Sequence, residues 1–275
     1  SEDIEIYAAS DSVKAGDSLD FFVDTSLSAV NILIYRTGYY GGMGGRLIHT
    51  ASDVTGIKQP DCARAEDTGL RTCSTWKSTY SLLIKDDWVS GVYLAQINSP
   101  DGQQQNDTVF VVRQDDRPSA MLYQMSTSTF QAYNNYGGKS TYSWNSGVCE
   151  TVAEAPRAVK VSLNRPYSAT FDDPNYFFRA EYPMLRWLEQ QGYEVTYSTS
   201  MDTHRSGKTK EKNHLLDHQI FLAAGHDEYW SQEMRDAITA ARDSGVHLGF
   251  FSANTGYWRV RFEPDPLTNG PDSVM

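Results

Sequence analysis

The chain has 275 residues, of which 40% are hydrophobic and 21% charged, values typical of a globular protein of one or two domains. Acidic residues outnumber basic residues by 35 to 24, which argues against nucleic acid as a partner, because phosphate contacts need a basic face. No apolar run approaches the roughly 20 residues that a membrane span needs, so no membrane partner is expected.

The three cysteines bear on the compartment of the protein. Cys62 and Cys73 bracket a polar loop that contains Gly69, and no Cys/His cluster indicates zinc. We favour a disulfide over the alternative of two unrelated buried thiols; it would stabilise the fold by roughly 2–4 kcal/mol. A disulfide implies an oxidising compartment, and therefore an extracytoplasmic protein, secreted or periplasmic. Cys149 is expected to be a free buried thiol.

Residues 1–116 show short runs rich in β-branched and aromatic residues, separated by turn clusters. Such spacing without helical periodicity predicts an immunoglobulin-like β-sandwich. The glycine-rich stretch 38–45 lacks the Gly-Lys-Ser/Thr of a phosphate loop and is interpreted as a tight, aromatic-packed turn. The predicted strands are Leu19–Asp24, Val30–Arg36, Ser81–Ile84, Val92–Ile97 and Thr108–Arg113.

Residues 117–275 follow a charged, proline-containing linker and alternate strands with helices. This order predicts an α/β domain with a doubly wound, mostly parallel sheet, whose ligands bind at the carboxyl ends of the strands. The last strand is expected to be buried on both faces, the lysine-rich stretch after residue 203 to be a solvated loop, and the domain to be truncated at its C-terminus. The predicted strands are Ala120–Gln124, Ala158–Leu163, Tyr193–Ser198, Gln219–Ala224 and Val246–Ala253; the predicted helices are Tyr182–Gln191 and Gln232–Ser244, the second capped by Ser231.

Two polar motifs follow buried strands directly. His226, Asp227 and Glu228 stand in a row between a strand and a helix, so at least one should face the crevice; helix capping is the alternative. Asn254 follows the next strand and supplies an amide, although asparagine is also common in turns. Because neighbouring strand ends share one crevice, Glu228 and Asn254 could meet there.

A third segment, 130–140, is dense in tyrosine, asparagine and glycine and contains Tyr133; an ordinary surface loop is the alternative interpretation. Tyr167 and Tyr176 add further phenols. Phenolates are hard anionic donors that suit a hard trivalent ion such as Fe(III).

Together these motifs resemble the N,N-dimethylformamidase large (beta) subunit family, which pairs an immunoglobulin-like domain with a glutamine-amidotransferase-like α/β domain. The resemblance covers most of the chain, and the motifs are specific as a set. The matching stretches are 34–42, 88–93, 131–134, 225–231 and 253–259.

The resemblance implies an amidohydrolase that acts on a small-molecule amide with a mononuclear iron held by two tyrosines and one glutamate. The glutamate falls on Glu228 and the first tyrosine on Tyr133; Tyr167 and Tyr176 compete for the second position, with Tyr167 preferred. His226 is then the proton carrier and Asn254 orients the amide.

A secreted, non-catalytic binding or surface protein with a degenerate α/β domain is the main alternative. A carbohydrate-active protein, indicated only by the 6 tryptophans and 17 tyrosines, is a third. The sequence leaves the substrate and homo-oligomerisation open.

Overall fold

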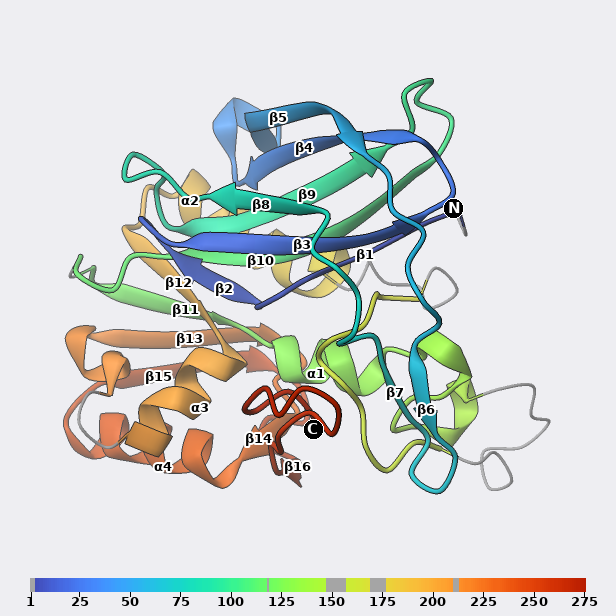
Figure 1. Ribbon diagram of the computed structural model, residues 1–275. Coiled ribbons are helices and arrows are strands. Elements are labelled where there is room, and N and C mark those ends of the chain that lie inside the picture. The colour runs from blue at the N-terminus through green and yellow to red at the C-terminus, as the bar shows by residue number, and fades with distance from the viewer. Residues whose placement is uncertain (1–2, 118, 147–156, 169–176, 210–212) are drawn as a thin grey trace.

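A computed structural model describes residues 3–117, 119–146, 157–168, 177–209 and 213–275. Cys149, expected to be a free thiol, and Tyr176, a candidate ligand, lie outside the described residues. Figure 1 shows two stacked parts: the N-terminal strands form the upper part, and a sheet flanked by helices forms the lower part.

The upper part consists of two sheets that pack face to face. Alternate residues of β3 and β4 point inward, such as Phe21, Val23, Ile32 and Ile34, and all four are fully buried in one shared core. The predicted strands of this part are confirmed, and the immunoglobulin-like topology stays a prediction. The sheets are β1 (Ile4–Ala8), β3 (Ser18–Thr25) and β8 (Tyr80–Leu83), and β2 (Ser12–Lys14), β10 (Gln105–Arg113), β9 (Gly91–Asn98), β4 (Ala29–Thr37) and β5 (Gly45–Thr55).

A hairpin leaves the upper part and packs on the lower one. It consists of β6 (Ala63–Ala65) and β7 (Leu70–Thr72), and the predicted Cys62–Cys73 disulfide closes its base. The Cys73 amide donates to the Asn164 carbonyl at 2.8 Å. The disulfide therefore fixes a segment that joins the two parts.

The lower part is built on a four-stranded parallel sheet with the order β12 (Val195–Thr199), β11 (Met121–Met125), β13 (Ile220–Gly225) and β15 (His247–Ser252). Helix α2 (Tyr182–Gln190) packs on one face through Leu185 and Leu188, and α4 (Gln232–Asp243) on the other through Met234 and Ile238. The Ser231 side chain accepts from the Met234 amide at 3.1 Å, as the predicted N-cap should.

The core beside α2 is shared with the upper part. Val92 of β9 and Val111 of β10 are fully buried in the same cluster as the residues of β11, β12 and α2. The two parts are therefore joined by a continuous apolar contact, in addition to the chain connection at 114–120.

Two expected elements are wrong. Ala158–Leu163 does not join the parallel sheet; Ser162 forms an isolated bridge to Val274, because the C-terminal residues return to pair with this stretch. The solvated loop after β12 is instead α3 (Ser200–Thr209). Its start carries a missed capping box, in which Asp202 Oδ2 accepts from the Thr199 amide at 3.0 Å.

Other differences concern burial and short elements. β15 lies at the edge of the described sheet and is not buried on both faces, since Phe251 is 61% exposed. A helix, α1 (Thr127–Tyr133), follows β11 where a loop was expected. Short strands β14 (Tyr229–Ser231) and β16 (Trp258–Val260) pair in parallel. No helix in the described ranges has the length and apolar character to cross a bilayer.

Candidate active site

The two strand-end motifs meet at the carboxyl edge of the parallel sheet. β13 ends at Gly225 and β15 at Ser252, and the two residues are partners in the ladder. Beyond them, the Trp258 amide donates to the Glu228 carbonyl at 3.0 Å. The loops expected to share one crevice are therefore hydrogen-bonded to each other.

Gly225 is required where the first loop begins. Its φ is +70°, and a Cβ atom there would lie 2.8 Å from the Cβ of Ala180. A residue with a side chain would be strained by both the backbone conformation and this contact. The sharp turn lets the following residues point in different directions.

Glu228 lies at the centre of the site and is only 3% exposed. Its amide donates to Thr129 Oγ1 at 3.0 Å, which fixes the backbone against α1. Its Oε2 accepts from the Tyr133 hydroxyl at 2.9 Å, and its Oε1 accepts from the Tyr142 hydroxyl at 2.7 Å. Two phenols therefore converge on one buried carboxylate.

Helix α1 and a return loop bring the two tyrosines together. Thr129 and Tyr133 are four residues apart and lie on one face of α1. The chain then reverses at Gly138, whose φ is +98°, and Asn145 Nδ2 donates to the Tyr133 carbonyl at 3.0 Å. As a result the rings of Tyr133 and Tyr142 lie 4.4 Å apart, centroid to centroid.

Burial governs the protonation of the phenols. It raises the pKa of Tyr133 to about 12, and it also raises the pKa of Tyr142, with hydrogen bonds to Tyr133, Tyr229 and Glu228 adding to the effect. Near neutral pH both hydroxyls therefore keep their protons and donate them to Glu228. A highly charged cation at this point would compete with those protons.

Asp227 points away from the tyrosines. It is fully buried, its Oδ2 accepts from Gln124 Nε2 at 3.0 Å, and its amide donates to Ser252 Oγ at 2.9 Å. Burial raises the pKa of its carboxyl to about 7. Of the three ionisable residues in a row, Glu228 contacts the tyrosines of the candidate site, and Asp227 contacts residues of the sheet edge.

His226 and Asn254 flank this arrangement. His226 is half-buried, directly before Asp227. Asn254 is exposed at the tip of the neighbouring loop with a φ of 55°, a conformation that asparagine tolerates in turns. Within the described ranges, no hydrogen bond joins the Asn254 side chain to Glu228. The catalytic roles expected for His226 and Asn254 stay predictions.

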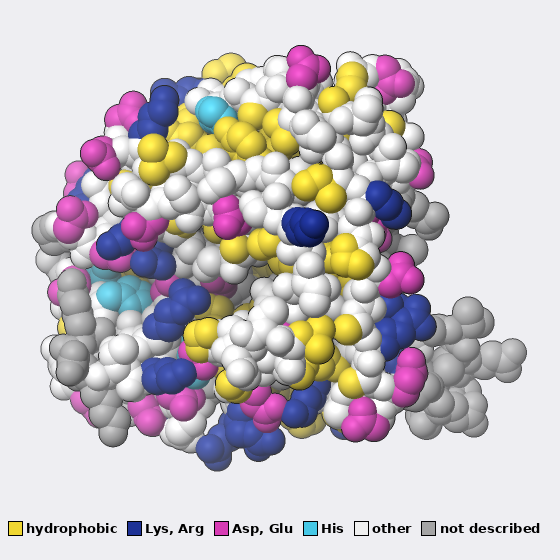
Figure 2. Space-filling model, in the orientation of Figure 1, with side chains coloured by type: hydrophobic (Ala, Val, Ile, Leu, Met, Phe, Trp, Pro, Cys, Tyr) yellow, Lys and Arg dark blue, Asp and Glu magenta, His cyan; other side chains and the backbone are white. Residues whose placement is uncertain are grey.

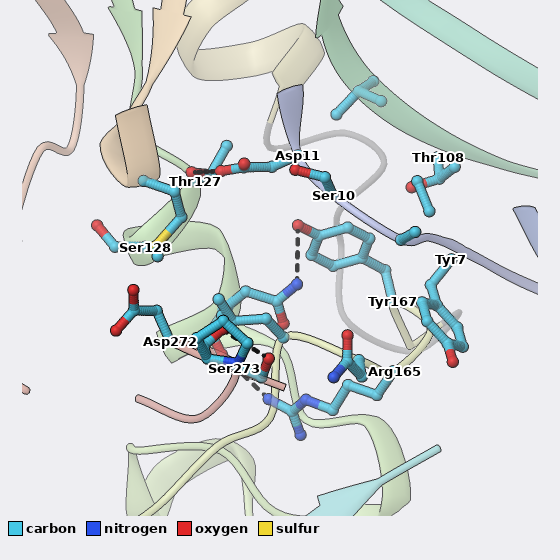
Figure 3. Close-up of a pocket in the computed structure, with 18 of the residues that line it drawn as sticks. Tyr7, Ser10, Asp11, Thr108, Thr127, Ser128, Arg165, Tyr167, Asp272 and Ser273 are labelled. Carbon is cyan, nitrogen blue, oxygen red and sulfur yellow. Dashed lines mark hydrogen bonds between the residues drawn. The ribbon is translucent and has the colours of Figure 1, made fainter. Parts of the chain in front are cut away.

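The second tyrosine that contacts Glu228 is Tyr142, whereas Tyr167 was expected in this position. Tyr167 accepts from Gln131 Nε2 at 3.2 Å and lines a separate cavity (Figure 3). Tyr142 follows the tyrosine-rich segment 130–140 by two residues, and the adjacent glycines of that segment were the signal for a chain reversal that returns it to Tyr133. The other candidate, Tyr176, is not among the described residues.

The donor set fits a hard metal ion. Within the part of the chain that the structure describes, no three His, Cys, Asp or Glu side chains gather as a metal site. The convergent groups are instead two phenols and one carboxylate, whose oxygens suit Fe(III). Tyr133, Tyr142 and Glu228 are thus the residues that could hold such an ion.

The family model described as N,N-dimethylformamidase beta subunit-like, C-terminal, matches residues 31–273, and the chain belongs to this family. A comparison with curated proteins finds no match. Among solved structures, the chain is similar to a superoxide reductase (neelaredoxin) from Ignicoccus hospitalis, with 15% identity over 40% of this chain and 77% of that chain. The TM-score of 0.22 is too low to support any inference.

Proposed function

We propose that this protein is a metal-dependent hydrolase of the C–N bond of small linear amides, with a mononuclear Fe(III) held by Tyr133, Tyr142 and Glu228. The observation that carries the proposal is the convergence of two phenol hydroxyls on the two oxygens of one buried carboxylate. Membership of the dimethylformamidase-like family supports the same reaction class.

Hydrolysis of an amide forms one C–O bond with water and breaks the C–N bond, and the nitrogen leaves with a proton as an amine. A bound ferric ion supplies Lewis acidity toward the carbonyl oxygen and the water. Because Glu228 would hold the ion, it would not be a free base, and His226 would take the proton from water and deliver it to the leaving nitrogen. Asn254, exposed on the neighbouring loop, orients the amide from the solvent side.

The rim of the site favours alkylated amides. Trp144 is 52% exposed, and its ring lies 6.3 Å from that of Tyr133 and 6.0 Å from that of Tyr142, centroid to centroid. Aromatic faces contact methyl groups well and offer no strong polar partner. We therefore expect N-alkyl amides to be better substrates than unsubstituted amides of the same acid.

The test is iron content together with visible absorption, measured on the wild type and on a matched pair of variants. The wild type should bind about one iron per chain and show a tyrosinate-to-Fe(III) charge-transfer band. Tyr142→Phe should lose the band and most of the iron, as should Glu228→Ala, whereas Tyr167→Phe should keep both.

If Tyr142→Phe keeps the band and the iron while Tyr167→Phe loses both, the second ligand is Tyr167. A wild type that stays colourless and metal-free after iron is offered would overturn the mechanism. A non-catalytic binding or surface protein would then become the favoured hypothesis.

The remaining proposals concern setting and architecture. The Cys62–Cys73 disulfide supports an extracytoplasmic location. The excess of acidic residues supports a small-molecule partner over nucleic acid. The two face-to-face sheets support an immunoglobulin-like sandwich, and the parallel sheet with a helix on each face supports a doubly wound α/β domain.

A further inference from the structure

A cavity of about 100 Å³ lies between the upper and lower parts, outside the site described above. Figure 2 shows it as a hollow at the centre of this face, with acidic and basic side chains near its rim. We name it the junction cavity. Its lining comes from six segments: residues 7–11, residues 108–109, one face of α1 (127, 128 and 131), the stretch 163–167, part of α3 (201 and 205) and residues 271–273.

Helix α1 separates the junction cavity from the tyrosine–glutamate site. Thr127, Ser128 and Gln131 face the cavity, while Thr129 and Tyr133 face Glu228. Residues spaced by three or four positions share a helix face, so one short helix presents two polar faces to two different sites.

Both arginines that line the cavity are bound to other groups, and Arg205 also acts electrostatically on Asp11. Arg165 is 1% exposed and donates four hydrogen bonds, all to backbone carbonyl oxygens, which makes it a structural group. Arg205 is half exposed and lies 3.4 Å from Asp202 Oδ1. Figure 3 shows Arg165 at the opposite end of the cavity from Asp11, with the Tyr167 ring between them.

The two carboxylates that line the cavity, Asp272 and Asp11, differ in their partners. Asp272 is bound by Lys208 Nζ at 2.8 Å. Asp11 accepts a hydrogen bond from Thr127 Oγ1 at 2.5 Å, and among the described residues it forms no ion pair. The nearby Asp202 is also negative and is itself paired with Arg113 at 2.7 Å.

The rest of the lining is partly apolar. Ala9, Val109 and Met201 contribute methyl and methylene groups to the same space. A desolvated carboxylate beside such groups favours a ligand that combines a positive N–H donor with short alkyl substituents. The volume equals about three water molecules' share of the liquid, which limits the ligand to a few non-hydrogen atoms.

We infer that the junction cavity binds a small alkylammonium ion, with its N–H groups on Asp11 and its alkyl groups against Val109 and Met201. A dialkylamine of this size is also what hydrolysis of a small N,N-dialkyl amide releases. That the physiological ligand is the product amine rests on the proposed function; the binding itself does not.

The experiment is isothermal titration of the metal-free protein with dimethylammonium chloride, with potassium and ammonium chloride as comparisons. We expect one site per chain and binding weaker by about tenfold or more in Asp11→Asn. Asp243→Asn, which removes an equal charge at an exposed position on α4, should bind as the wild type does. Ala9→Leu narrows the cavity from an exposed position, keeps Asp11, and should also lose binding.

The outcomes that would contradict the inference are specific. Equal binding to the wild type and Asp11→Asn, or none to the folded wild type, would overturn the inference. Equal affinity for potassium and dimethylammonium would overturn the inference that the alkyl groups contribute to binding. Because the protein is metal-free, this result is independent of iron and turnover; inhibition of amide hydrolysis by dimethylammonium would then identify the ligand as the product.

Discussion

Ionisation of Glu181 should lower the free energy of unfolding as the pH rises. The residue ends the π-helical turn Phe177–Glu181 and is fully buried. Its carboxyl accepts hydrogen bonds from the Tyr123 hydroxyl and, at 3.0 Å, from the Ser126 amide. Burial raises its pKa from 4.5 to about 8, and the neighbouring Asp227 adds to the rise.

The direction and size of the effect follow from proton linkage. The folded protein holds this proton more tightly than the unfolded chain, so the contribution of Glu181 is fully present below pH 4.5 and is lost as pH rises through about 8. At about 1.4 kcal/mol per pH unit, the loss amounts to roughly 5 kcal/mol at most. Glutamine keeps the shape of the side chain but has no proton to lose.

Urea unfolding of metal-free protein between pH 5 and pH 9 measures the effect. Glu181→Gln should lose clearly less unfolding free energy across this range than the wild type, with a remainder from Asp227, whose pKa is raised to about 7. Glu194→Gln, at a side chain that is 73% exposed, is the matched control and should follow the wild type. If Glu181→Gln and the wild type lose the same free energy, Glu181 is ionised in the folded protein and the reasoning fails.

Two further predictions concern the frame around the site. Ser231→Ala removes the side chain that caps α4 at 3.1 Å and should lower the unfolding free energy by about 0.5–2 kcal/mol, measured by urea unfolding; no change would mean that water replaces the cap. Replacing Cys62 and Cys73 by serine should cost about 2–4 kcal/mol, and reductant should lower the melting temperature of the wild type only. An equal response of both proteins to reductant would contradict the disulfide.

The sequence was sufficient for elements whose apolar pattern matches their environment. The alternation in β3 and β4 and the apolar face of α2 predicted these elements to within a few residues. Helix α1 was missed because no apolar stripe marks its sequence: Phe130 and Ala132 pack into apolar cores, and most of its other residues are polar. Pairing of the stretch around Ser162 with Val274 joins residues far apart in the chain, and neither stretch alone indicates its partner.

The candidate site shows the same limit. The residues that a strand-end motif supplies, Glu228 above all, could be predicted from their position after a buried strand. The partner Tyr142 could not, because a phenol near a glycine turn becomes a neighbour of Tyr133 only once the return loop is folded against α1. Tyr167 was preferred from the sequence because it follows a predicted strand, but the segment 163–167 lies along the junction cavity instead.

Helix α1 explains why the site and the junction cavity should influence each other. Its Thr129 holds the backbone of Glu228 at 3.0 Å, and its Thr127 holds the Asp11 carboxylate at 2.5 Å on the opposite side. A helix of seven residues is too short to be stable without tertiary contacts, so its position depends on both anchors. Binding of a cation at Asp11 therefore acts on the same element that positions Tyr133, and any such coupling must be reciprocal: a metal ion held by Tyr133 and Glu228 would change the affinity of the junction cavity by the same factor.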